Sequence, residues 1–247
     1  MSVPSGRQVA LVTGGVRGIG LAICERFIRS GTFVAAGYSR NDDLAAEFLE
    51  RHGADNVSVH QGNIANHEDC TKVIDEVIER HGRLDILVNN AGITVDRTVR
   101  KMSPEEWTRV IQVNLNGAFF MCRSALPHMI ERGYGRIVNI SSVIGETGNI
   151  GQANYAAAKS GLFGLTMSLA LETARRGITV NCVAPGFVET DMVAAVPPEA
   201  MEKVLALIPA GRLGQPDEIA RVVEFVAAPE SGYITGQAYS INGGLNM

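Results

Sequence analysis

The chain has 247 residues, of which 46% are hydrophobic and 19% are charged, and its formal net charge is −4. This composition is that of a globular protein, and the mixed charges exclude a strongly basic face for nucleic acid or membrane binding. The N-terminal residues form no apolar signal segment and no apolar run is long enough to span a bilayer, so we expect a cytoplasmic protein. The four cysteines are scattered, which predicts neither a metal site nor a disulfide framework.

Short β-branched runs alternate with longer helical patterns along the whole chain. The predicted strands span Gln8–Thr13, Thr32–Ala36, Val57–Gln61, Asp85–Asn89, Arg136–Ser141, Thr179–Val183 and Ala238–Ile241. The predicted helices span Gly18–Arg29, Asp42–His52, His67–His81, Pro104–Glu131, Gln152–Arg175 and Pro216–Ala227. Most strands are apolar without alternation, as expected when helices cover both faces. We predict an α/β fold of the Rossmann type, with one doubly wound parallel sheet in a single domain over residues 1–247.

A glycine-rich turn, Thr13-Gly-Gly-Val-Arg-Gly-Ile-Gly20, joins the first strand to the first helix. Glycines allow a tight turn and close backbone approach to a pyrophosphate, and the helix N-terminus offers free N–H groups. The same pattern also occurs in an ordinary strand-to-helix turn. Its position in the first such unit favours a dinucleotide site.

The end of the second strand indicates which dinucleotide is bound. An NAD site needs a carboxylate there to accept from the ribose 2′-hydroxyl. Here the strand ends Ala36-Gly-Tyr-Ser-Arg40, with no acid before Asp42. Arg17, Ser39 and Arg40 could together bind a 2′-phosphate, which predicts NADPH. The alternative is that both arginines are solvated surface charges.

Tyr155 and Lys159 lie four residues apart in a helical pattern and therefore share one helix face. A nearby ammonium favours the phenolate and lowers the tyrosine pKa, which makes the phenol a usable acid or base. Ser142, thirteen residues upstream, could hold a carbonyl oxygen within reach of the tyrosine. The alternative is an interfacial tyrosine beside a solvated lysine.

Further motifs occur in the same order. Asn89-Asn-Ala-Gly92 follows the fourth strand, Asn114 lies in Gln-Val-Asn-Leu-Asn, and Pro185-Gly-Phe-Val-Glu-Thr-Asp191 follows the sixth strand. With the glycine-rich turn and Ser142, Tyr155 and Lys159, the chain resembles the short-chain dehydrogenase/reductase family over nearly its whole length. The resemblance implies that Tyr155 donates a proton to the substrate carbonyl and that Ser142 orients the carbonyl oxygen. It implies that Lys159 lowers the Tyr155 pKa and holds the nicotinamide ribose, and that Asn114 supports a water-linked proton relay.

The resemblance also implies a set of cofactor contacts. Asn63-Ile64 stands beside the adenine, where the family commonly has Asp-Val. The full set of expected NADP(H) contacts is Gly14, Arg17, Gly18, Ile19, Gly20, Ser39, Arg40, Asn63, Ile64, Asn90, Ala91, Gly92, Tyr155, Lys159, Pro185, Gly186, Val188 and Thr190.

Within the family, several stretches are similar to reductases of 3-oxoacyl thioesters. Gly151-Gln-Ala-Asn-Tyr155 looks like carrier-protein-dependent members of fatty acid synthesis. Arg100-Lys-Met102 and Asn242-Gly-Gly-Leu-Asn-Met247 look more like acetoacetyl-CoA reductases of polyhydroxyalkanoate synthesis. We favour a CoA thioester. A carrier-bound thioester and an unrelated ketone remain alternatives, whereas a non-catalytic member would be expected to lose Tyr155 or Lys159.

Two larger features complete the expectations. Residues 190–213 are predicted to cap the substrate. The apolar-rich helices over 104–131 and 152–175 carry more small and apolar residues than one sheet face can cover, and the family implies a homotetramer paired through them. Arg132 and Arg176 stand near where carrier-dependent relatives use basic residues, or are cations favoured by helix ends.

Overall fold

The computed structural model describes residues 6–194 and 198–247, and its strands form one seven-stranded sheet. The strand order is β3-β2-β1-β4-β5-β6-β7, and every pair is parallel. The strands are β1 (Val9–Thr13), β2 (Phe33–Tyr38), β3 (Val57–Gln61), β4 (Ile86–Asn89), β5 (Gly135–Ile140), β6 (Ile178–Pro185) and β7 (Ala238–Ile241). The predicted Rossmann-type fold is confirmed. The order reverses between β1 and β4, where doubly wound sheets hold ligands at the carboxyl ends of their strands.

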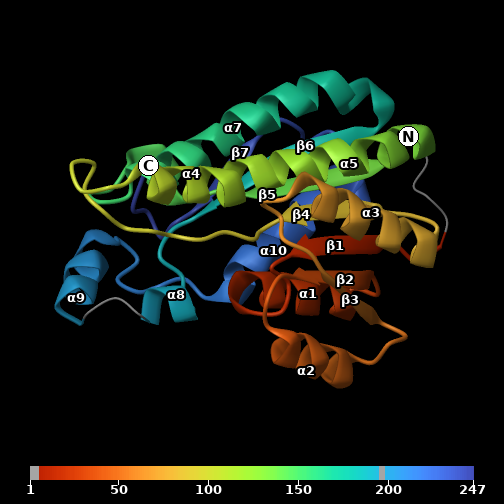
Figure 1. Cartoon of the computed structure of the whole chain (residues 1–247), viewed down its shortest axis with the longest axis horizontal. Helices are drawn as coiled ribbons and strands as arrows, with labels where there is room; N and C mark the ends of the chain where they lie inside the picture. Colours follow the sequence, from red (N-terminus) through yellow and green to blue (C-terminus); the bar gives the residue numbers. More distant parts are fainter. Residues whose placement is uncertain (1–5, 195–197) are drawn as a thin grey trace.

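Helices cover both faces of the sheet (Figure 1). One face packs against α1 (Gly18–Arg29), α2 (Asp42–His52) and α10 (Pro216–Ala227). The other packs against α3 (His67–His81), α5 (Gly117–Arg132) and α7 (Ala153–Thr173). The central strands are buried on both faces, which explains their unbroken apolar runs.

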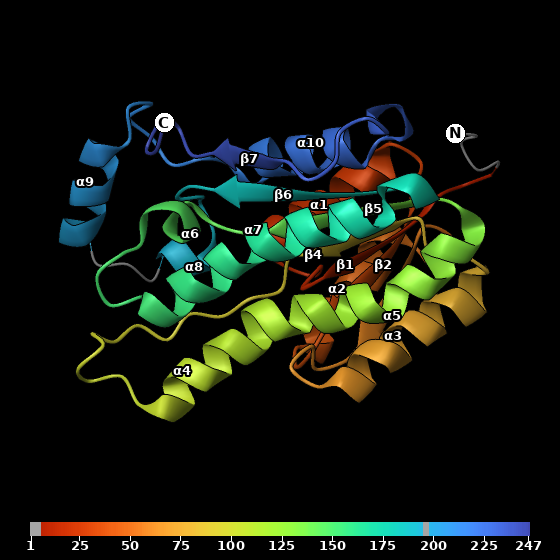
Figure 2. The same ribbon diagram turned by 90° about the horizontal axis from the view of Figure 1, so that it is seen from above.

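The shorter helices gather at one end of the molecule. These are α4 (Pro104–Ile111), α6 (Val143–Thr147), α8 (Asp191–Ala194) and α9 (Pro198–Leu207). Figure 2 shows them at the end where the C-terminus lies, opposite the N-terminus. Turns of 3-10 helix occur at η2 (Ala174–Arg176) and η3 (Pro229–Ser231). Among the described residues, no helix is both long and apolar enough to cross a membrane.

Four predicted helices, α1, α2, α3 and α10, are confirmed to the residue. Local capping explains two of them. The Asn41 side chain accepts from Leu44 N at the start of α2, and the Asn66 side chain accepts from Asp69 N at the start of α3. The predicted strands are confirmed: β3 and β7 match to the residue, and the ends of the other strands differ by at most two residues.

Two helix predictions need correction. The single helix predicted over Pro104–Glu131 divides into α4, a π-helical turn η1 (Gln112–Asn116) and α5. The helix predicted over Gln152–Arg175 is α7 followed by the tighter turn η2, because Gly177 adopts a left-handed conformation that ends it.

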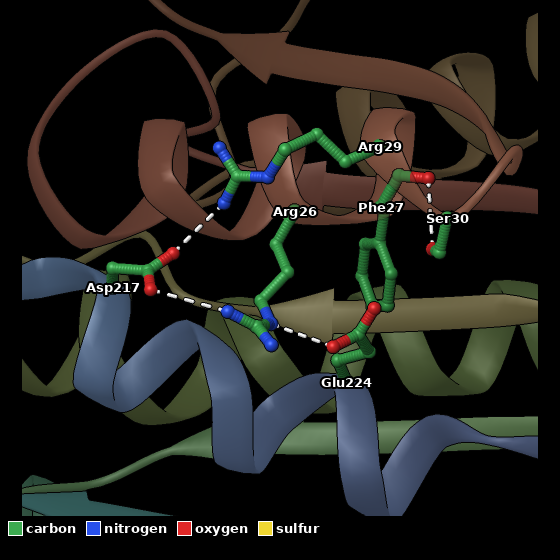
Figure 3. Close-up of polar contacts among 6 residues, drawn as sticks. All are labelled: Arg26, Phe27, Arg29, Ser30, Asp217 and Glu224. Carbon is green, nitrogen blue, oxygen red and sulfur yellow. Dashed lines mark hydrogen bonds and ion pairs between the residues drawn. The ribbon is translucent and has the colours of Figure 1, made fainter.

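An ion-pair network joins α1 to α10 (Figure 3). Arg26 Nε lies 2.6 Å from Glu224 and Arg26 Nη1 lies 3.1 Å from Asp217, which also pairs with Arg29 at 2.8 Å. Surface ion pairs contribute little individually, but this network is shared among four side chains that join two helices. It holds in place the helix whose N-terminus carries the glycine-rich turn.

Candidate active site

The glycine-rich turn has a backbone that only glycine fits. Gly14 has φ +65°, and a Cβ on Gly20 would lie 2.1 Å from the Gly14 carbonyl oxygen. Gly18, also at positive φ, ends the turn where α1 begins. The turn therefore packs closely against the start of α1. It leaves the N-terminus of this helix uncovered, as a pyrophosphate site requires.

Thr13 and Asn90 join this turn to the end of β4. The Thr13 hydroxyl accepts from the backbone N–H groups of Asn90 (3.0 Å) and Ala91 (3.1 Å). The Asn90 side chain donates back to the Thr13 carbonyl at 2.9 Å. The structure thus brings Gly14 and the Asn90-Ala-Gly92 turn to one place. Thr13 did not emerge from the sequence, because a threonine at a strand end is common.

The residues predicted to choose the cofactor share the same edge of the sheet. Arg17 precedes α1 and Ser39 and Arg40 follow β2, which pairs directly with β1. All three are exposed, and neither arginine forms an ion pair among the residues that the structure describes. The two guanidinium groups are therefore available to an anionic ligand.

Asn63 and Ile64 lie on the loop after β3. The Asn63 backbone N–H donates to Asp69 Oδ2 at 2.8 Å, and its side-chain oxygen accepts from Ala65 N at 3.1 Å. The loop is thus rigid, and its exposed Asn63 amide nitrogen remains a hydrogen-bond donor. Ile64 packs against Gly117, where a Cβ would lie 2.9 Å from the Ile64 carbonyl oxygen.

Asn114 lies in the π-helical turn η1 and is buried. Its side chain accepts from Ile93 N at 2.8 Å and donates to Ile93 O at 2.9 Å. A Cβ on Gly92 would lie 3.1 Å from Asn114 Oδ1 and 3.6 Å from Lys159 Nζ, so these three residues meet. Single π turns are frequent at functional sites, and this one places Asn114 beside Gly92, which Lys159 also approaches.

Ser142, Tyr155 and Lys159 come together at the carboxyl end of β5. Ser142 is the N-cap of α6, where its hydroxyl accepts from Ile144 N at 3.2 Å, and it is near enough to the Tyr155 phenol to influence the pKa of that group. Lys159 is 3% exposed and donates from Nζ to the Ile140 carbonyl at 2.7 Å. Its Nζ lies 5.6 Å from the centre of the Tyr155 ring.

Burial dominates the ionisation of this group. It raises the pKa of Tyr155; the Ser142 hydroxyl opposes this shift and Asp96 adds to it. Burial lowers the pKa of Lys159 to about 8, opposed by Cys182. Desolvation is thus the largest influence on the Tyr155 pKa, whereas the Lys159 ammonium donates to the Ile140 carbonyl. That Lys159 lowers the Tyr155 pKa stays a prediction.

The segment after β6 lies on the other side of the candidate site, next to the glycine-rich turn. The Gly186 backbone N–H donates to Ile241 O at 2.9 Å, and Val188 pairs with Gly214 in an isolated bridge. A Cβ on Gly18 would lie 3.7 Å from Thr190 Cγ2, so Thr190 sits beside the glycine-rich turn. The predicted cap over 190–213 contains α8 and α9, and its residues 195–197 lie outside the described residues.

Two further contacts at the site were not predicted from the sequence. The Ser141 hydroxyl donates to the Lys159 carbonyl at 2.8 Å, which fixes α7 against β5. Gln152 Nε2 donates to both oxygens of Asp96, at 3.1 and 3.2 Å, which fastens the loop after β4 to the start of α7. Neither contact follows a spacing rule, since each joins segments that meet only in the fold.

Comparison with known proteins assigns the chain to a family. A model of the short chain dehydrogenase family matches residues 8–200. The chain belongs to the short-chain dehydrogenase family, and it is an oxidoreductase that uses a nicotinamide cofactor, as predicted from the sequence.

Three similar proteins are named as reductases of 3-oxoacyl thioesters. The chain is 48% identical to acetoacetyl-CoA reductase of Shinella zoogloeoides over 238 residues, 96% of this chain and 98% of that protein. It is 44% identical to acetoacetyl-CoA reductase of Cupriavidus necator over 244 residues, 98% and 99% of the two chains. It is 45% identical to 3-oxoacyl-[acyl-carrier-protein] reductase FabG of Vibrio cholerae over 240 residues, 97% and 98% of the two chains.

Proposed function

We propose that this protein reduces a 3-oxoacyl-CoA thioester of the acetoacetyl type to the 3-hydroxyacyl thioester with NADPH. The observation that carries the proposal is the meeting of Ser142, Tyr155, Lys159 and Asn114 at the carboxyl edge of the sheet, beside the glycine-rich turn. The names of its relatives, acetoacetyl-CoA reductase and FabG, support the thioester class.

The proposed roles are those that the family resemblance implies, and the positions of the four side chains support them. NADPH, when bound, supplies the hydride that the carbonyl carbon accepts. The Tyr155 hydroxyl gives its proton to the carbonyl oxygen, and burial keeps that hydroxyl protonated until the oxygen gains charge. Ser142 donates a hydrogen bond to the same oxygen and stabilises the developing charge. Lys159 holds the nicotinamide ribose, and Asn114 connects it to solvent protons.

The residues fit NADP(H) at two places. The Gly14–Gly20 turn leaves the N-terminus of α1 open to a pyrophosphate. A side chain at Gly20 would fill the space between the turn and the start of the helix. Arg17 and Arg40 are exposed and form no ion pair within the part of the chain that the structure describes, so both can meet a 2′-phosphate. NADPH should therefore bind more tightly than NADH, and Arg40→Ala should lose about tenfold or more in NADPH affinity alone. Titration of both cofactors into both proteins tests this, and equal affinities in the wild type would contradict it.

One assay tests the proposed activity. NADPH oxidation should be faster with acetoacetyl-CoA than with acetoacetyl-carrier protein at equal concentrations. The reverse preference would make the protein a carrier-dependent reductase of fatty acid synthesis. Turnover of neither thioester, with turnover of simple ketones, would overturn the thioester proposal.

We also propose that residues 190–213 cap the substrate and that the protein is a homotetramer. Exposed apolar residues on α5 and α7 support assembly: Phe119, Ile130, Met167 and Leu171. Strand β7 is the last in the sheet, so its outer edge is available for another copy. A monomer in light scattering at micromolar concentration would contradict the assembly. A cytoplasmic location accompanies the proposal, since all four cysteines are free thiols.

A further inference from the structure

Ser142 stands on a helix too short to be stable alone. α6 runs only from Val143 to Thr147, and isolated helices of one turn are unstable in water. Its position must therefore come from contacts with its neighbours. One of these is with α7, where the Ser160 hydroxyl donates to the Gly145 carbonyl at 2.5 Å.

A second attachment is made by Glu146 to the C-terminal end of the chain. One carboxylate oxygen of Glu146 accepts from the Ser240 hydroxyl on β7, and the other accepts from Asn246 Nδ2 at 3.1 Å. Ser240 and Asn246 are 94 and 100 residues away in sequence. Figure 2 shows α6 and the C-terminus at the same end of the molecule.

The C-terminal segment that Glu146 holds, Asn242–Met247, also supports the rest of the site. Asn242 Nδ2 donates to the Asn246 carbonyl at 2.9 Å, and Asn242 Oδ1 accepts from Gly244 N at 2.9 Å. Asn242 packs on Gly186, where a Cβ would lie 2.8 Å from the Asn242 Cα. Gly243 O accepts from Ala210 N at 3.0 Å, at the end of the cap.

We infer that Glu146 is a positioning residue for the reaction, which it serves by fixing α6, and with it Ser142, to the segment Asn242–Met247. That segment contacts Gly186 after β6 and Ala210 at the end of the cap. Glu146 therefore connects α6, on one side of the site, to these two segments on the other side. The inference rests on the proposed function, in which Ser142 orients the substrate carbonyl. Neither Glu146 nor Asn246 needs to touch the substrate for this role.

The first experiment measures kcat for acetoacetyl-CoA reduction at saturating NADPH. Glu146→Ala should lower kcat by about tenfold, the effect of losing one well-placed hydrogen bond in the transition state. Asn246→Ala should give part of this loss, and Glu146→Gln, which keeps an acceptor for Asn246, should restore most of it. Thr147→Ala is the matched control. Among the described residues, the Thr147 hydroxyl bonds only to the carbonyls of Val143 and Gly148, and the kcat of this variant should be unchanged.

A double-mutant cycle separates positioning from general weakening of the fold. If Glu146 acts through Ser142, then adding Glu146→Ala to Ser142→Ala should cause no further loss of kcat. An undiminished kcat in Glu146→Ala, or the same loss repeated in the Ser142→Ala background, would overturn the inference.

Amide hydrogen exchange tests the same inference without a substrate. Amides of Ile144 and Gly145 should exchange about tenfold faster in Glu146→Ala than in the wild type. Unchanged exchange would overturn the inference even if the wild type is active. A wild type that does not reduce acetoacetyl-CoA, together with faster exchange in the variant, would contradict the proposed function and leave the support of α6 in place.

Discussion

Burial favours the neutral form of both Tyr155 and Lys159, since it raises the pKa of the phenol and lowers that of the ammonium to about 8. A protonated phenol is the state that a proton donor needs during reduction. The Ser142 hydroxyl, which opposes the shift at Tyr155, is the neighbour that eases release of its proton. Lys159 affects the ionisation of the site through the loss of its own proton more than through the effect of its charge on the tyrosine.

Tyr155→Phe removes this proton donor and little else. Activity should fall by ~10²–10⁴-fold, because a positioned general acid is lost. NADPH affinity should stay nearly unchanged. The measurement is kcat with saturating NADPH, with cofactor binding followed by fluorescence of the single tryptophan, Trp107. Turnover like that of the wild type would remove Tyr155 from its assigned role.

Lys159 should make stability depend on pH above neutrality. Its pKa is about 8 in the folded protein and near 10.5 when unfolded, so the unfolded state holds more protons between these values. Stability of the wild type should therefore rise as pH increases from 8 to 10.5, by on the order of 3 kcal/mol from this group. Denaturant unfolding of wild type and Lys159→Met at several pH values measures it. The variant should lack this rise, and parallel curves would contradict the assignment.

At the level of elements, the sequence predicted most of the fold because its signals are local. Apolar runs marked the strands, and the structure shows that the side chains of Asn41 and Asn66 cap the starts of two helices. The π turn at Asn114 was missed because its cause is distant: the Asn114 side chain completes two hydrogen bonds with Ile93. The order of motifs predicted Ser142, Tyr155 and Lys159 as one group, whereas the direction of the Tyr155 pKa depends on burial, which no motif encodes.

The helices α6 and α7 pack closely together at the site. A Cβ on Gly145 would lie 2.9 Å from the Lys159 carbonyl carbon and 3.0 Å from Ser160 N. Gly145→Ala should therefore push the two helices apart, cost about 1–3 kcal/mol of stability and lower kcat. Thermal unfolding and the reductase assay measure both effects.

Gly164→Ala is the control on the same helix, α7. A Cβ there meets nothing within 4 Å, and alanine favours helix over glycine by about 1 kcal/mol. Gly164→Ala should leave the stability of the single subunit unchanged or raise it. Because Gly164 is exposed on the same helix as Met167 and Leu171, light scattering checks that the variant assembles like the wild type. If Gly145→Ala were as stable and as active as the wild type, the packing of α6 on α7 would not determine the geometry of the active site.

On the scale of the whole molecule, Arg132 and Arg176 lie far from the active site of their own chain. Arg132 ends α5 and Arg176 ends the turn η2 after α7, so both stand where the following strands β5 and β6 begin. Tyr155 is near the other end of α7. At a rise of 1.5 Å per residue it lies about 27 Å from Thr173, the last residue of that helix. These arginines could present a carrier protein only to the active site of another subunit.

The double variant Arg132→Glu/Arg176→Glu tests whether they do. For the proposed CoA thioester reductase, kcat/KM should change by the same factor with acetoacetyl-CoA and with acetoacetyl-carrier protein, since both substrates are anionic. Measurement at low and high ionic strength separates steering from damage, because screening weakens steering. A loss confined to the carrier-bound substrate and reduced by salt would show that the arginines dock an acidic carrier. That result would identify the carrier-bound thioester, delivered across a subunit interface, as the substrate of this reductase.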